Sequence, residues 1–142
     1  MKSCVLLTLA VALMAAACGG EKGRAAAAPP QQAVAWKAVG TWSGRGNKQT
    51  ESFTSDSGAL RIHWKTTLGD AESASTGRFR VTAHSAISGR LLDQVVDHRG
   101  AGDGIGFVNQ DPHVFYLMIE SDHVDWTLLV EEAIAGTVTA PR

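Results

Sequence analysis

The chain has 142 residues, and its 13 basic and 14 acidic side chains leave a net charge of −1 at neutral pH. Because the charge is nearly balanced and no basic run occurs, a nucleic-acid partner is not expected. The length suits one domain, and the chain contains only two cysteines, Cys4 and Cys18.

The first feature along the chain is a short apolar segment that ends at a cysteine. Lys2 precedes an apolar stretch over residues 5–17 that only Thr8 interrupts. This stretch is shorter than the ~20 residues that a transmembrane helix needs. A charged start, an apolar core and small residues at the cleavage point are typical of a secretory signal peptide. We therefore expect residues 1–17 to be removed, together with Cys4.

The sequence AAAC over residues 15–18 resembles the lipobox, the cleavage signal of bacterial lipoproteins, although Ala15 stands where that family favours Leu. The resemblance implies that Cys18 carries palmitate-type acyl chains and anchors the protein to a membrane of the cell envelope. One chain holds only marginally, so two or three are needed. Gly19 rather than Asp after the cysteine implies the outer membrane if the source is Gram-negative. The alternative is an ordinary secreted protein with Cys18 unmodified or lost.

The segment after Cys18 is typical of a tether. Residues 18–35 contain glycine, alanine and the pair Pro29-Pro30, with almost nothing large to bury, so burial cannot offset the entropy of ordering them. We expect a lipidated flexible tether over 18–35, a folded domain over 36–138 and a frayed tail over 139–142.

Apolar and polar residues alternate through most of the domain, which predicts strands that are buried on one face. In LRIHWKTTL, for example, Leu60 and Ile62 point to one side while Arg61 and His63 point to the other. The expected strands, in chain order, are residues 39–46, 51–57, 60–68, 77–86, 92–96, 104–109, 114–121 and 123–130. The stretch 90–98 around the strand at 92–96 is also compatible with a short amphipathic helix, and 114–121 is apolar enough to predict a central strand covered on both sides.

Short strands separated by turn sequences predict an all-β fold, a jelly-roll-like sandwich of two antiparallel sheets with seven or eight strands. The expected core consists of the large inward-facing side chains: Trp42, Phe53, Leu60, Ile62, Trp64, Phe79, Val81, Val95, Phe107, Phe115, Leu117, Ile119, Trp126, Leu128 and Val130. Trp36 and Trp42 lie near the tether, where they cover the end of the sandwich or are exposed for binding.

The succession GxG, ExF, LRIHW, GRFRV, GxGxGF, VFYLMIES and WTLLV resembles small extracytoplasmic β-sandwich domains of bacteria and archaea. CUB domains and pre-peptidase C-terminal domains share this layout, which here covers residues 40–131. Residues 111–113, Asp-Pro-His, stand where such domains often place a glycine. The resemblance implies a fold and an extracytoplasmic location, and it implies no catalytic residues.

Basic side chains on the polar faces of two predicted strands are the first candidate site. If the two strands paired, they would form a cationic surface for an anionic envelope partner. The alternative is an ordinary solvated face. The residues are Arg61, His63, Lys65, Arg78, Arg80 and His84.

Oxygen-rich loops are the second candidate site, because calcium prefers carboxylate and amide ligands. The candidate ligands are Asp97, Asp103, Asn109 and Asp111, although their spacing matches no EF-hand and Asp-Gly pairs are ordinary turns. Neither HExxH nor GxSxG occurs, so an enzyme is not expected, nor a cofactor other than calcium. The sequence therefore predicts a membrane-anchored protein whose domain binds an envelope partner or ligand, with a calcium- or carbohydrate-binding module as the alternative.

Overall fold

The computed structural model describes residues 32–69 and 77–137, which form strands and turns. The strands are β1 (Gln32–Arg45), β2 (Lys48–Gln49), β3 (Phe53–Ser55), β4 (Ala59–Leu68), β5 (Arg78–Ser85), β6 (Leu91–Arg99), β7 (Gly102–Asn109), β8 (His113–Asp122) and β9 (Val124–Thr137). The expected signal peptide, Cys18, most of the expected tether and the expected tail lie outside the described residues. Within the described part, no helix is long and apolar enough to cross a membrane.

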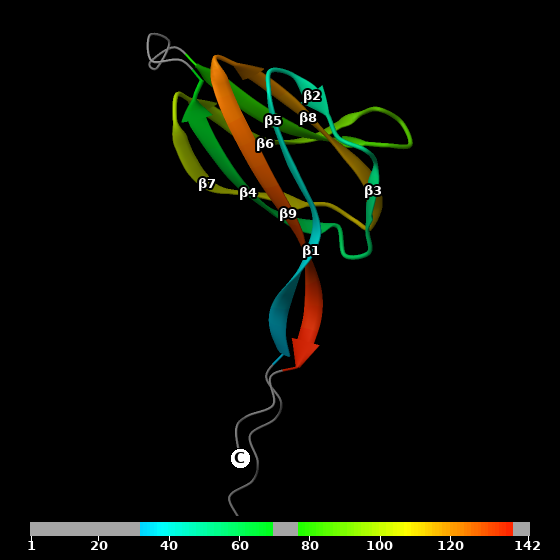
Figure 1. Cartoon of the computed structure of the whole chain (residues 1–142). Coiled ribbons are helices and arrows are strands. Elements are labelled where there is room, and N and C mark those ends of the chain that lie inside the picture. Colours follow the sequence, from blue (N-terminus) through cyan, green and yellow to red (C-terminus); the bar gives the residue numbers. More distant parts are fainter. Residues whose placement is uncertain (1–31, 70–76, 138–142) are drawn as a thin grey trace, which may run out of the picture.

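The strands form two antiparallel sheets packed as a sandwich, as the sequence predicts (Figure 1). Sheet A has the strand order β1-β9-β4-β7. Sheet B has the order β2-β8-β5-β6, and β3 also pairs with β8. The described residues hold nine strands rather than seven or eight, because the segment after β1 contributes two short strands, each of which pairs with β8.

The core lies between the sheets and consists of side chains that alternate along the strands. Ten of the expected core residues are buried in one cluster. Burying each of the larger side chains stabilises the fold by ~1.5–3 kcal/mol. They are Leu60, Ile62, Phe79, Val81, Phe115, Leu117, Ile119, Trp126, Leu128 and Val130. Four more, Trp42, Phe53, Trp64 and Val95, pack against the cluster while partly buried.

Phe107 is the one expected core residue that faces solvent, with 54% of its surface exposed, and Val108 is buried instead. Glycines occupy the inward positions of β7 because neighbouring side chains fill the space. A Cβ on Gly104 would lie 2.8 Å from the Trp64 ring, and one on Gly106 would lie 2.8 Å from the Val95 carbonyl oxygen. Phe107 therefore belongs to the outward phase of the strand.

Strand pairing and side-chain exposure decide two further predictions, one for β6 and one for β8. β6 is a strand from Leu91 to Arg99, paired with β5, so the helical alternative for residues 90–98 is wrong. β8 is central, as expected, but it is not covered on both sides, because Met118 on its outer face is 39% exposed. No second layer packs on that face within the described residues, so apolar residues there meet solvent.

Strand β1 begins at Gln32, four residues inside the segment expected to be a tether. Residues 32–36 pair with residues 133–137 of β9, in register from Gln32↔Thr137 to Trp36↔Ala133. Backbone hydrogen bonds to a partner strand order this segment without a large core. We call these ten residues the terminal ribbon, and Figure 1 shows it extending beyond the body of the sandwich.

Candidate functional site

The outer face of sheet A carries a cluster of charged, aromatic and apolar side chains that contact one another outside the core. The register places Arg61 of β4 between Glu131 of β9 and Phe107 of β7. Two residues farther along β4, His63 lies opposite Ile105 of β7. Since residues directly opposite across antiparallel strands lie about 5 Å apart at Cβ, these side chains share one surface.

Charges inside this cluster are neutralised by hydrogen bonds. Arg61 donates from Nε to Glu131 Oε2 at 2.7 Å, and its Nη2 lies 2.6 Å from the same oxygen. His63 Nε2 lies 2.8 Å from that oxygen as well. The hydrogen bond from Arg61 holds the pKa of Glu131 below its usual value, against the raising effect of desolvation, and His63 lowers it further. The cluster is therefore a fixed group with Arg61 at its centre.

Aromatic and apolar side chains surround this charged group. The guanidinium carbon of Arg61 lies 4.4 Å from the ring centroid of Trp36, which is within range of a cation–π contact. The ring centroids of Trp36 and Phe107 are 6.5 Å apart. Phe107 is 54% exposed and Ile105 is 50% exposed. We call Trp36, Arg61, His63, Ile105, Phe107 and Glu131 the sheet A surface.

A hollow of about 290 Å³, with hydroxyl and charged side chains among its lining residues, lies farther along the same strands. An ion pair borders it, in which Arg45 Nε donates to Asp125 Oδ1 at 2.6 Å and lowers the pKa of Asp125. The hollow adds hydroxyl and amino groups to the outer face of sheet A. Its lining residues are Ser43, Gly44, Lys65, Thr67, Asp125, Trp126 and Thr127.

The sequence predictions contain only part of the sheet A surface. They name Arg61 and His63 as candidate binding residues, but they place Phe107 in the core and leave Trp36 open between covering the end of the sandwich and binding. A usable signal was present in GIGF, because glycines at 104 and 106 leave Ile105 and Phe107 in the opposite phase. An aromatic residue that alternates with glycine marks the face opposite a close packing contact.

The expected cationic surface is not formed, because its two strands do not pair. Arg61, His63 and Lys65 lie on β4 in sheet A, whereas Arg78, Arg80 and His84 lie on β5 in sheet B. The outward side chains of the two sheets point away from each other. The six residues therefore belong to two separate surfaces.

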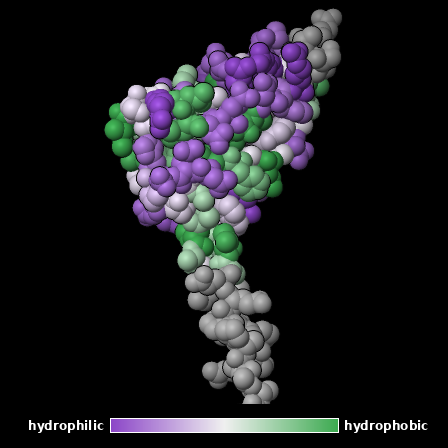
Figure 2. All heavy atoms as spheres, turned by 180° about the vertical axis from the view of Figure 1, so that it is seen from behind, coloured by the Kyte–Doolittle hydropathy of each residue, from purple (hydrophilic) through white to green (hydrophobic). Residues whose placement is uncertain are grey.

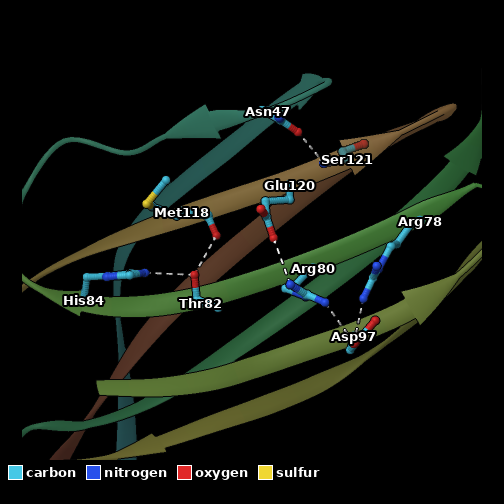
Figure 3. Close-up of polar contacts among 9 residues, drawn as sticks. All are labelled: Asn47, Arg78, Arg80, Thr82, His84, Asp97, Met118, Glu120 and Ser121. Carbon is cyan, nitrogen blue, oxygen red and sulfur yellow. Dashed lines mark hydrogen bonds and ion pairs between the residues drawn. The ribbon is translucent and has the colours of Figure 1, made fainter. Parts of the chain in front are cut away.

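On sheet B the basic side chains are also neutralised (Figure 3). Arg78 and Arg80 lie 3.4 and 3.7 Å from Asp97, and Arg80 lies 3.3 Å from Glu120. His84 stacks on Tyr116 with ring centroids 5.1 Å apart. The arginines of this face are paired with carboxylates at the surface, so the face offers little net positive charge to an anionic partner.

The four candidate calcium ligands are not brought together. Asp97 faces the arginines of β5. Asp103 and Asn109 stand near opposite ends of β7, about 20 Å apart at ~3.3 Å per residue. Among the described residues, no group of three or more His, Cys, Asp or Glu side chains could hold a metal ion.

One serine–histidine pair belongs to a turn rather than to a cleft. Ser85 Oγ lies 2.6 Å from His113 Nε2. The same oxygen accepts hydrogen bonds from the backbone of Ile87 and Ser88, each at 3.3 Å. Ser85 is only 2% exposed, and its contacts fasten the turn between β5 and β6.

Comparison with known proteins adds no family to this description. No protein-family model matches the chain, and neither a curated protein nor a solved structure matches it.

Proposed function

We propose that the chain is a lipid-anchored extracytoplasmic protein whose sandwich recognises an envelope partner or ligand through the sheet A surface. The lipobox-like sequence before Cys18 supports the anchor. The observation that carries the binding role is the pair of half-exposed side chains, Phe107 and Ile105, around the Arg61–Glu131 ion pair. The proposed kinship with CUB-like domains adds the extracytoplasmic setting.

The composition of the sheet A surface supports recognition. Aromatic residues and arginine are enriched where interfaces derive most of their binding energy. Arg61 is held between the Trp36 ring and the Glu131 carboxylate, so little rotamer freedom remains to be lost on binding. Phe107 adds a rigid ring that can be covered without breaking any hydrogen bond of the fold.

A carbohydrate ligand is the second candidate, and the hollow of about 290 Å³ on the outer face of sheet A favours it. An exposed aromatic ring packs against a sugar face, while hydroxyl and amino groups nearby bond to sugar hydroxyls. Phe107 and the hollow around Ser43, Lys65 and Thr127 supply both kinds of contact on one face. No comparable observation favours calcium.

The binding role is tested with the acylated protein from its native host. Phe107→Ala is compared with Ile87→Ala, which removes an apolar side chain that is even more exposed, 78% against 54% for Phe107, from the turn between β5 and β6. We expect Phe107→Ala to weaken capture of envelope components at least about tenfold, the effect of ~1.4 kcal/mol at a binding hot spot. Capture that is unchanged in Phe107→Ala, or equally reduced in Ile87→Ala, contradicts the proposed surface.

Two additional measurements separate the parts of the proposal. Intact mass tests whether Cys18 is acylated and the leader removed. Cosedimentation with peptidoglycan sacculi tests the carbohydrate candidate, and the Arg78→Glu/Arg80→Glu variant serves as a control on the opposite sheet. We expect that control to bind like the wild type, because β5 faces away from the sheet A surface.

A further inference from the structure

The terminal ribbon exposes apolar side chains on both of its faces. Val34 is 66% exposed and Ile134 is 42% exposed, and they point to opposite sides because Val34 pairs with Ala135 while Ile134 pairs with Ala35. Between Ala33 and Trp36, and between Ala133 and Gly136, no residue is charged. Figure 2 shows hydrophobic residues gathered where the ribbon leaves the body.

The ribbon is unusual for a segment surrounded only by water. Strand β4 pairs with β9 no farther than Glu132, so beyond that residue the ribbon has two strands and free edges. A two-stranded ribbon is marginally stable in water by itself, and exposed apolar ribbons with free edges tend to associate with other surfaces. An apolar hollow of about 320 Å³ lies against Ala33, Val34 and residues 133–135.

We propose that the terminal ribbon rests in the interfacial region of a lipid bilayer, with Val34 and Ile134 entering the boundary between headgroups and acyl chains. The inference rests on the proposed anchor at Cys18. Fourteen residue steps separate Cys18 from Gln32, a span of roughly 50 Å at full extension. The acyl chains therefore hold the ribbon within reach of the lipid surface.

The residues at the base of the ribbon also suit this boundary. Trp36 closes the apolar stretch of β1, and tryptophan rings are enriched at the interface between membrane and water. Lys37 and Glu132, paired across the two strands, are the first charged residues on the body side. The free backbone edges exclude deep burial in hydrocarbon, but they can bond to water and headgroups at the interfacial depth that amphipathic segments occupy.

A second copy of the chain fits the ribbon less well. Five residue pairs at ~3.3 Å per residue, with two strands each ~4.8 Å wide, give a face of roughly 160 Å². A specific protein interface needs roughly 600 Å² or more from each partner. Because four of the ribbon residues are alanine, shape-specific contacts there are also few.

The test uses a spin label at residue 34. With the leader removed and Cys18 acylated, the Val34→Cys variant carries a single reactive thiol, and so does the control variant Ile87→Cys. Each acylated, labelled protein is reconstituted into vesicles of phosphatidylethanolamine and phosphatidylglycerol. Collision of the label with a water-soluble nickel chelate is then measured, and Ile134→Cys provides an independent position on the other face.

We expect at least a threefold lower nickel collision rate at residues 34 and 134 than at residue 87. Protein that floats with the vesicles but shows equal rates at all three positions overturns the ribbon inference and leaves the anchor intact. Protein that does not float overturns both. Spin–spin broadening at residue 34 that persists in detergent and grows with protein concentration shows a second copy instead, which also overturns the inference.

Discussion

The clearest test of the fold concerns Glu132, a carboxylate on the inner face of β9 that is only 4% exposed. Its Oε1 accepts hydrogen bonds from Ser55 Oγ and from the backbone nitrogen of Ser57, both at 2.9 Å. Gly58 in turn donates to Ser55 Oγ at 2.9 Å. One buried charge thus fastens the turn between β3 and β4 to β9.

The hydrogen bonds to Glu132 determine how much stability the Glu132→Gln substitution should remove. Desolvation raises the pKa of Glu132, but hydrogen bonds from Ser57, Ser55 and the Asp56 backbone more than offset it, so the pKa lies below its usual value of 4.5. Hydrogen bonds to a charged group contribute ~1.5–3 kcal/mol each. Glu132→Gln keeps one acceptor oxygen and loses the charge, so we expect it to lower the free energy of unfolding by ~1.5–3 kcal/mol at neutral pH.

The stability that the Glu132 carboxylate contributes should fall as the pH is lowered. A carboxyl group whose pKa is lower in the folded state stabilises the fold at pH values above its unfolded pKa. That stabilisation disappears as the pH falls through the folded pKa. The difference between wild type and Glu132→Gln should therefore be full near neutral pH and shrink below about pH 4.5.

Urea denaturation followed by tryptophan fluorescence, from about pH 7 down to about pH 3.5, measures this difference. Glu120→Gln is the control, because its side chain is 57% exposed and pairs only at the surface. That variant should cost at most ~1 kcal/mol. A Glu132→Gln effect below ~0.5 kcal/mol, or one that stays constant down to low pH, would refute the account of the buried carboxylate.

Two other predictions compare matched substitutions by the same urea assay. Phe115→Ala should cost ~3–5 kcal/mol because Phe115 is fully buried, whereas Phe107→Ala should cost at most ~1 kcal/mol; the reverse order would mean that β7 is placed in the wrong phase. Gly46 and Gly58 both have φ above +70°, but a Cβ on Gly46 meets open space and one on Gly58 meets the backbone of Gln110. Gly46→Ala should therefore cost ~1–2 kcal/mol and Gly58→Ala clearly more, and equal costs would contradict the close approach.

Local alternation was enough to predict most of the sandwich. Leu60 and Ile62 alternate with charged residues, so both the strand and its buried face could be read from sequence. The same reasoning failed for β7, because Gly104 and Gly106 provide no side chain with which to set the phase. The glycines do alternate with Ile105 and Phe107, and the space that Trp64 and Val95 take up beside Gly104 and Gly106 shows why this alternation turns Phe107 outward.

The candidate site was beyond local sequence patterns for a different reason. Its residues come from four strands of sheet A that lie far apart in sequence, and Arg61 meets Glu131 only through the pairing of β4 with β9. The same limit affected the expected cationic surface. Alternation shows that Arg61 and Arg80 each point outward from a strand, but it cannot show that the two strands belong to opposite sheets.

The two proposals together restrict what the sheet A surface can bind. Val34 and Trp36 are two residues apart on one strand, so they share a face and lie ~7 Å apart. A ribbon that rests at the lipid boundary therefore brings Trp36, and the Arg61 guanidinium stacked on it, to the level of the headgroups. A ligand there must itself lie at the membrane surface. Binding that is equally strong for a soluble ligand in detergent and for a membrane-bound one in vesicles would argue that the two features act independently.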